Sequence, residues 1–170
     1  MHQQNKHRSC GTYAVRCLTK ADLPRILELC QGNPQYYYHL HERPTVVSIN
    51  EDMERLPPGC TAEQKSYLGF FDSCSKLIAV LDLVRGYPTT HHAFIGFFMV
   101  CASEQGCGVG RRIIRCILNR LRNEGFDRVR LAYVEGNEQS STFWLSCGFS
   151  NTGERVVHDR YALIPMERRL

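Results

Sequence analysis

Residues 97–112 constrain the fold more than any other part of this 170-residue chain. An apolar strand pattern ends at Val100, and residues 105–110 (QGCGVG) then lead directly into a basic amphipathic helix pattern. Three glycines within five residues remove side chains where the backbone approaches something closely, and the start of the following helix presents unpaired N–H groups and a positive dipole end. This combination predicts a phosphate site, although a tight turn that holds no ligand would carry the same glycines.

The spacing of the glycines excludes two common phosphate loops. A dinucleotide loop needs G-x-G-x-x-G, but its last position falls on Arg111 when the pattern starts at Gly106 and on Ile113 when it starts at Gly108. A nucleoside-triphosphate loop needs a lysine and then a serine or threonine after its last glycine, whereas Gly110 is followed by two arginines. The predicted phosphate therefore belongs to another kind of ligand.

Two motifs in this order resemble those of the GCN5-related N-acetyltransferase (GNAT) superfamily. Val100 is followed five residues later by Gln105 and then by x-x-G-x-G, which is similar to the family's acyl-coenzyme A pyrophosphate motif. Residues 137–149 (NEQSSTFWLSCGF) resemble the family pattern N-x-x-[AS]-x-x-[FL]-[YW]-x-x-x-G-F. A strand and a helix are expected between the two motifs, and the resemblance covers residues 13–166.

The resemblance implies a mixed α/β fold with a central, mostly antiparallel twisted sheet of about seven strands, splayed in the middle and flanked by about four helices. The hydrophobic patterning predicts the order β-α-α-β-β-β-α-β-α-β-β. The helix after Gly110 is best defined, since its apolar residues form one stripe: Ile113, Ile114, Ile117, Leu118 and Leu121. A second helix is predicted to start near Ser48. We expect a single domain over residues 1–170, with residues 1–11 as a flexible tail.

By the same resemblance, the chain transfers an acetyl group from acetyl-CoA directly to an amine while both ligands are bound. The pantetheine arm would pair with the splayed strand like an additional strand, and the backbone N–H of Val100 would stabilise the oxyanion that forms during transfer. The residues expected to bind the cofactor are Phe98, Met99, Val100, Gln105, Gly106, Cys107, Gly108, Val109, Gly110, Arg111, Asn137, Ser140 and Phe143. For Asn137, a helix-capping role is the alternative.

The acceptor amine must lose a proton before it can attack, so a base has to face it. Asp82 is the candidate base and a candidate acceptor contact, because it is the one acid in the apolar run 77–84. The alternative is a carboxylate at an exposed strand end or paired with an arginine. Glu135 and the pair His91-His92 are weaker candidates.

The acceptor itself is expected against the aromatic segment 33–45. Tyr36 and Tyr37 are the predicted substrate-binding residues, and Tyr38, His39, His41 and Glu42 follow them. Aromatic walls suit a cationic amine, while packing of the tyrosines against the protein is the alternative. No part of the two motifs falls in this segment, so the identity of the amine stays open.

The chain departs from the commonest family pattern at Trp144, where a tyrosine often donates a proton to the departing thiolate of coenzyme A. An indole N–H is a hydrogen-bond donor only and cannot perform this step. Solvent, Tyr133 or Cys147 would then have to protonate the thiolate.

Composition bounds the remaining possibilities. A net charge of +4 favours an anionic ligand without requiring one, and no apolar run approaches the length of a membrane span. Nine cysteines without a C-x-x-C pair indicate reduced, structural thiols rather than a disulfide framework or a zinc site. We therefore expect a cytoplasmic protein with no bound metal, no nucleic acid and no membrane partner, acting on a small-molecule amine, in a fold compatible with a homodimer.

Three alternatives remain at this stage. The acceptor could be a protein N-terminus or a lysine, which would need an open groove instead of a pocket. The chain could bind acyl-CoA without turnover, for which the tryptophan at position 144 is the one supporting feature. The arginine-rich helix could bind nucleic acid, but neither aromatic residues nor a recognition motif accompany it.

Overall fold

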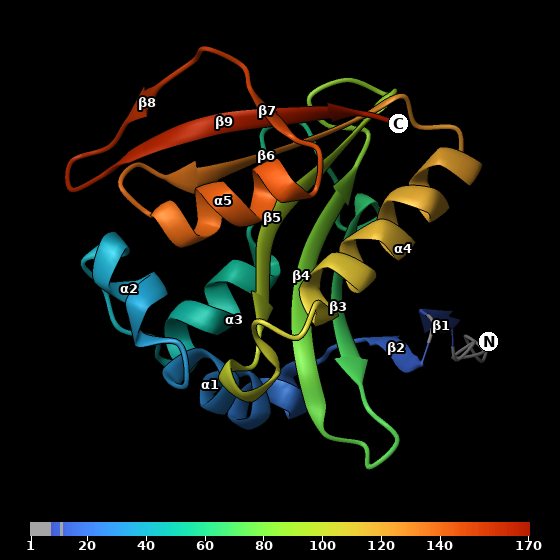
Figure 1. The fold of residues 1–170 in the computed structure, drawn as a ribbon, viewed down its shortest axis with the longest axis vertical. Coiled ribbons are helices and arrows are strands. Elements are labelled where there is room, and N and C mark those ends of the chain that lie inside the picture. The colour runs from blue at the N-terminus through green and yellow to red at the C-terminus, as the bar shows by residue number, and fades with distance from the viewer. Residues whose placement is uncertain (1–7, 11) are drawn as a thin grey trace.

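The computed structural model of the protein describes residues 8–10 and 12–170 (Figure 1). The strands are β1 (Arg8–Cys10), β2 (Tyr13–Cys17), β3 (Lys65–Phe71), β4 (Leu77–Arg85), β5 (His92–Val100), β6 (Arg128–Val134), β7 (Ser150–Asn151), β8 (Val156–Val157) and β9 (Ala162–Arg169). The helices are α1 (Leu23–Gln31), α2 (Pro34–Leu40), α3 (Val46–Glu54), α4 (Val109–Asn123) and α5 (Glu138–Ser146). Short 3-10 helices lie at η1 (Lys20–Asp22), η2 (Ala62–Gln64) and η3 (Ala102–Glu104).

One sheet joins all the strands in the order β1-β2-β3-β4-β5-β6-β9-β7, with β8 also paired to β9. Across the described residues, every pairing is antiparallel except that of β5 with β6. The predicted mixed α/β fold is confirmed, with nine strands and five α-helices in the described part of the chain instead of about seven and about four. The additional elements are short strands near the chain ends and the helix α2.

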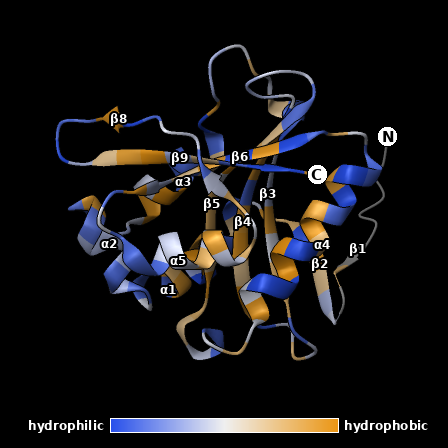
Figure 2. Cartoon of the chain, turned by 45° about the horizontal axis from the view of Figure 1, so that its top comes forward, coloured by the Kyte–Doolittle hydropathy of each residue, from blue (hydrophilic) through white to orange (hydrophobic). Residues whose placement is uncertain are grey.

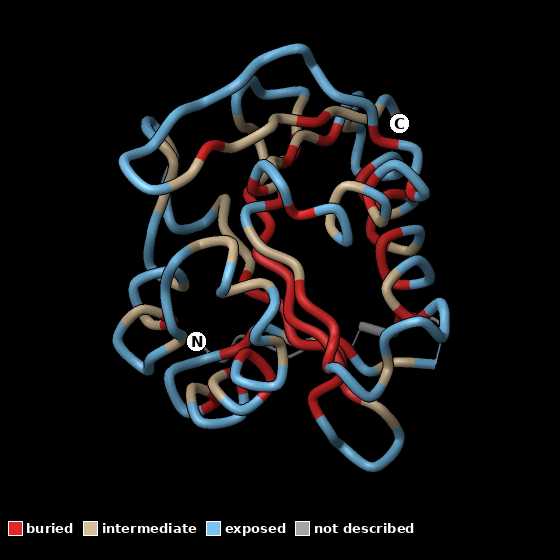
Figure 3. Tube along the Cα trace, turned by 60° about the vertical axis from the view of Figure 1, so that its left-hand side comes forward, coloured by how far each residue is buried: buried red, intermediate tan, exposed pale blue. Residues whose placement is uncertain are grey.

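The helix α4 follows the sequence prediction closely. Its predicted stripe is buried from Ile113 to Leu121, together with Val109. Figure 2 shows hydrophobic and hydrophilic residues alternating along α4, and the hydrophobic residues of the stripe are the buried ones. The buried residues of the molecule concentrate in the central strands β3, β4 and β5, as Figure 3 shows. Because the apolar stripe of α4 is buried against the sheet, the start of α4 and the glycine loop before it are held beside the end of β5.

The sheet is splayed between β5 and β6. The parallel register pairs His92–Ile95 with Arg128–Leu131 and ends there, so the last residues of β5 diverge from β6. A bulge opposite Asp82 in β4 shifts the register at the same point and skips Gly96. A Cβ atom at Gly96 would lie 2.5 Å from the Asp82 Oδ2 atom, so a side chain at position 96 would collide with this carboxylate. The absence of a side chain at Gly96 therefore leaves room for the Asp82 carboxylate.

Three expectations need correction or comment. The helix α3 begins at Val46, before the predicted start, because Thr45 caps it: its Oγ1 accepts the backbone N–H of Ser48 at 3.0 Å. The thiols are not all reduced, since Cys10 of β1 and Cys116 of α4 form a disulfide. The predicted flexible tail falls on residues 1–7 and 11, outside the described residues, and on residues 8–10, which form β1.

No helix in residues 8–10 and 12–170 combines the length and the apolar character that a membrane span requires.

Candidate active site

A cavity of about 880 Å³ lies where the glycine loop, the end of β5, the α1–α2 turn and the start of α5 meet. Every predicted cofactor residue except Cys107 lines it: Phe98, Met99, Val100, Gln105, Gly106, Gly108, Val109, Gly110, Arg111, Asn137, Ser140 and Phe143. Cys107 is exposed. The segments 98–111 and 137–146, one from each motif, therefore line the same cavity.

The glycine loop is shaped to admit a ligand against its backbone. Gly106 and Gly108 both have φ of +75°, a left-handed conformation that favours glycine. A Cβ atom at Gly106 would meet nothing within 4 Å, so the space beside this residue is open. Gly108 caps the start of α4, whose first N–H groups have no partner within the helix. An anionic group such as a diphosphate fits this arrangement.

The side chain of Gln105 has a structural role. Its Nε2 donates to the backbone oxygen of Val100 at 2.9 Å and to Oδ1 of Asn33, while its Oε1 accepts Nε2 of Gln139 at 3.1 Å. One glutamine thus ties the end of β5, the α1–α2 turn and α5 together. The sequence did not single out these two partners of Gln105: Asn33 is the first residue of the segment assigned to the acceptor, and Gln139 is an unspecified position of the second motif.

The backbone of Val100 faces the gap between β5 and β6. The next residue, Cys101, donates its N–H to the Ile78 oxygen at 2.8 Å, toward β4. Because successive residues of a strand direct their N–H groups to opposite sides, the Val100 N–H is directed away from β4. The side chains of Gln105 and Asn33 bond the Val100 oxygen from that same side. This orientation fits the predicted contact with an oxyanion.

The start of α5 is organised by Asn137. Its side chain is buried, and its Oδ1 accepts the backbone N–H of Ser140 at 3.0 Å, which is the helix-capping alternative raised by the sequence. Asn137 also lines the large cavity, so capping and a place in the cavity wall occur together.

An aromatic cluster closes the cavity between the splayed strands. The ring of Phe98 is stacked on Phe143 at 5.8 Å, and Trp144 packs against Phe98 at 5.9 Å and against Phe149 at 5.3 Å. Trp144 is buried, so it fills the space between β5 and α5. Neither Tyr133 nor Cys147, the two candidate proton donors to the thiolate, lines this cavity, and burial raises the pKa of the Cys147 thiol.

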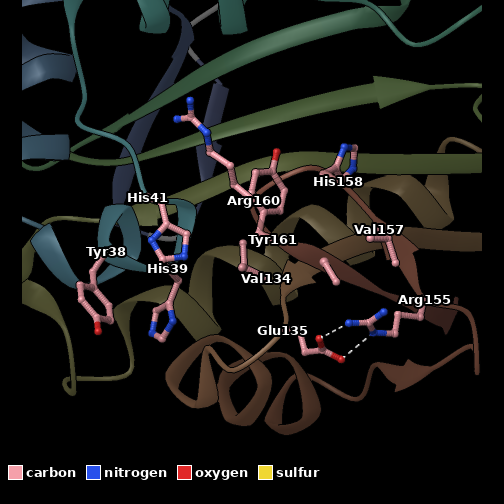
Figure 4. Close-up of a pocket in the computed structure, with 11 residues that line it drawn as sticks. Tyr38, His39, His41, Val134, Glu135, Arg155, Val157, His158, Arg160 and Tyr161 are labelled. Atoms are coloured by element: carbon pink, nitrogen blue, oxygen red, sulfur yellow. Dashed lines mark hydrogen bonds and ion pairs between the residues drawn. The ribbon is translucent and has the colours of Figure 1, made fainter.

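A second cavity of about 420 Å³ lies at the far end of α2 (Figure 4). Its walls come from the end of α2, the end of β6, and the segment that connects β7 to β9. The residues that line it are Tyr38, His39, His41, Val134, Glu135, Arg155, Val157, His158, Arg160, Tyr161 and Ala162. The aromatic segment 33–45 therefore contributes to this cavity through its second half.

The two predicted substrate-binding tyrosines lie elsewhere. Tyr36 lines the large cavity and packs edge-on against Phe97 at 5.6 Å. Tyr37 packs against the hydrophobic core, where burial raises the pKa of its hydroxyl, and it lines neither cavity. Consecutive residues of a helix point about 100° apart, which the sequence run YYY does not reveal.

Glu135 forms an ion pair inside the smaller cavity. Arg155 donates Nε to one carboxylate oxygen at 2.9 Å and a terminal nitrogen to the other at 2.7 Å, and Figure 4 shows both contacts. The hydrogen bond from Arg155 lowers the pKa of Glu135. The carboxylate therefore stays ionised and is a poor proton acceptor at neutral pH.

Asp82 is buried beside Lys65, whose Nζ lies 2.9 Å from its Oδ2. The other oxygen, Oδ1, has no hydrogen-bond partner within the described part of the chain. Burial raises the pKa of Asp82, against the opposing effect of Lys65. Asp82 lines neither cavity, so its position argues against direct contact with an acceptor. Of the weaker candidates, His92 is the first residue of β5 and His91 directly precedes it, at the opposite end of the strand from Val100.

Solved structures with this fold are numerous. An acetyltransferase from Thermus thermophilus has 21% sequence identity and a TM-score of 0.72, covering 94% of this chain and 97% of its own. A GCN5-related N-acetyltransferase from Kribbella flavida has 26% identity and a TM-score of 0.67, with coverage of 95% and 100%. A spermidine N-acetyltransferase from Vibrio cholerae, in complex with CoA and spermine, has 17% identity and a TM-score of 0.70, with coverage of 94% and 96%.

Among curated proteins no significant match is found. A family model described as the acetyltransferase (GNAT) family matches residues 27–149. The matched region begins in α1 and includes the glycine loop, α4, β6 and α5, and so contains the large cavity. The family uses acetyl-CoA as its acetyl donor. The chain therefore belongs to the GNAT family, and it is an N-acetyltransferase.

Proposed function

We propose that the protein transfers the acetyl group of acetyl-CoA to a primary amine of a small molecule, with both ligands bound at the same time. The observation that carries this proposal is the position of the two cavities. Both contact α2, through Tyr36 in the large cavity and Tyr38 in the small one. Both also reach the turn after β6, where the Asn137 N–H donates to the Val134 oxygen at 3.0 Å.

The large cavity suits the donor. The backbone of residues 106–110 and the start of α4 would hold the diphosphate, with Arg111 beside it. The gap-facing backbone of β5 would orient the pantetheine arm by strand-like pairing. Acetyl-CoA supplies an activated thioester, and the Val100 N–H is the donor available to a developing negative charge. Loss of such a contact typically costs about 3 kcal/mol of transition-state stabilisation.

The small cavity suits the acceptor. Its volume of about 420 Å³ lies within the range typical of small-molecule sites and gives little room for a folded protein partner. Tyr38 and Tyr161 supply aromatic walls, and Val134 brings the end of the splayed strand β6 into the cavity. An amine held there approaches the thioester from the side of β6.

The test is an acetylation assay on the purified chain with acetyl-CoA and a panel of amines, followed by release of free coenzyme A thiol and by mass spectrometry of the products. We expect thiol release that depends on the amine, and a product heavier by one acetyl group. Peptides with free N-termini form a separate arm, and a clear preference for them would favour the protein-acetyltransferase alternative. Tight acetyl-CoA binding with no amine-dependent thiol release would overturn the proposal in favour of a non-catalytic binding module.

A further inference from the structure

We infer that the acceptor amine carries an oxyanion group, a carboxylate or a phosphate, which is bound at the rim of the small cavity by Arg160 and the neighbouring imidazoles. This inference rests on the proposed function, because it concerns the substrate class of the same site. It follows from the balance of charges among the residues that line the cavity.

The single carboxylate among the lining residues is not free to bind a cation. Glu135 is held at both oxygens by Arg155, at 2.9 and 2.7 Å. A polyamine carries several ammonium groups, and binding it would require unpaired carboxylates within the cavity to replace lost hydration. The charge pattern of this cavity therefore disfavours a polyamine, although one solved structure of the same fold is a spermidine N-acetyltransferase.

The remaining charge is positive. With Glu135 and Arg155 neutralising one another, Arg160 remains, and it forms no ion pair or hydrogen bond within residues 8–10 and 12–170. It is exposed, in the segment between β8 and β9, so its guanidinium can turn toward a ligand in the cavity. A guanidinium binds a carboxylate or a phosphate through two parallel hydrogen bonds.

Imidazoles surround the same cavity. His39 and His41 come from the end of α2, and His158 comes from the segment that also carries Arg160 (Figure 4). Each neutral imidazole has one N–H donor and one acceptor nitrogen, and each protonated one has two donors. Together with the N–H groups of Arg160, which has no acceptor, donors outnumber free acceptors among the polar groups of this wall, as expected of a site that binds an anion.

The experiment compares amines with matched skeletons. The carboxylate arm uses γ-aminobutyrate, with n-butylamine as the neutral analogue and putrescine as the cationic one. The phosphate arm compares phosphoethanolamine with ethanolamine. We expect kcat/KM for at least one oxyanion-bearing amine to exceed that of its analogues by about tenfold or more, the size of one charge-assisted hydrogen bond. The arm with the larger ratio identifies the anion.

Variants connect the preference to the named residues. Arg160→Gln should remove most of the preference by raising KM for the anionic amine, with little change for n-butylamine. Arg155→Gln frees the Glu135 carboxylate and should increase the use of putrescine, a gain that misfolding cannot produce. The matched control is Arg115→Gln, since Arg115 is an exposed arginine of α4 that lines neither cavity.

The possible results separate this inference from the function on which it rests. If putrescine or n-butylamine is acetylated as well as its anionic analogue, and Arg160→Gln changes nothing, the inference is wrong while the proposed function stands. If no amine of the panel is acetylated, the proposed function fails and the inference fails with it.

Discussion

At the scale of single residues, the buried carboxylate of Asp82 needs a charged partner, because burial of an unpaired charge is strongly unfavourable. Lys65 compensates for its burial, and the Lys65 Nζ also donates to the backbone oxygens of Asp52 at 2.8 Å and Arg55 at 2.7 Å. All three donors of the ammonium are therefore used, and they tie the end of α3 to the centre of the sheet. Asp82 and Lys65 act as a structural pair beneath the bulge at Gly96.

The sequence predicted an unusual acid at position 82 but could not identify its partner. An apolar run with one carboxylate is visible in the letters, and pairing with an arginine was the alternative considered. The partner is a lysine 17 positions earlier, brought close by the register of β3 against β4. Such a register depends on the whole sheet, so no local pattern reveals the pair.

We predict that Lys65→Met destabilises the protein by about 3 kcal/mol near neutral pH, because it leaves a buried carboxylate without its partner. Burial already raises the pKa of Asp82, and the substitution raises it further. Between the unfolded and folded pKa values the folded state binds more protons, so the variant's free energy of unfolding should increase as the pH falls through this window. Urea unfolding at several pH values measures this.

The control for this prediction is Lys20→Met. Lys20 pairs with Glu54 at 2.7 Å, but the two side chains are 72% and 56% exposed. Removal of such a surface pair should cost less than about 1 kcal/mol. An equal loss in the two variants, or a Lys65→Met loss that does not diminish toward acid pH, would contradict the interpretation.

At the scale of elements, the glycine loop and α4 were the most predictable part of the molecule. Glycine spacing and an apolar stripe are both local signals, and they specified the loop, the helix and its buried face. The role of the Gln105 side chain was not predictable, because its partners come from α1–α2 and α5, which are distant in the sequence. The motif predicts a glutamine at position 105, but it does not reveal which groups the side chain of this glutamine bonds.

We predict that Gly108→Glu weakens the binding of coenzyme A by at least about tenfold, because it places a carboxylate where the loop would meet a diphosphate. Isothermal titration calorimetry measures this affinity. Gly108 has a φ of +75°, so any side chain there also strains the backbone.

Gly153→Glu separates the two effects. Gly153 has a φ of +85° and open space around it, and it lines neither cavity, so the variant carries a similar backbone strain without the misplaced charge. We expect wild-type affinity for coenzyme A from this control. Equal losses in both variants would mean that strain, and not the site, explains the result.

At the scale of the whole molecule, the order of the main elements followed from the sequence, but the edges of the sheet did not. The strands β1, β7 and β8 contain two or three residues each, too few to establish a period of two. The small cavity was also beyond sequence reasoning in its full extent. It combines the end of α2 with residues 134–162, which meet only after the sheet has formed.

The disulfide between Cys10 and Cys116 joins β1 to α4 across 106 positions of the sequence. We predict that the unfolded, unreduced protein exposes seven titratable thiols, the seven cysteines that are free in the structure, and that reduction raises the number to nine. A count of nine without reductant would show that the bond does not form. Disulfides are rare in reducing compartments, so the count also bears on the expected cytoplasmic location.

The separate walls of the two cavities have a kinetic consequence. Within the described chain, no residue that lines one cavity also lines the other. Neither cavity is built from residues of the other, although both contact α2 and the turn after β6, so we expect no compulsory order of arrival. Steady-state rates would then follow a random sequential scheme, in which either substrate saturates the enzyme independently of the other.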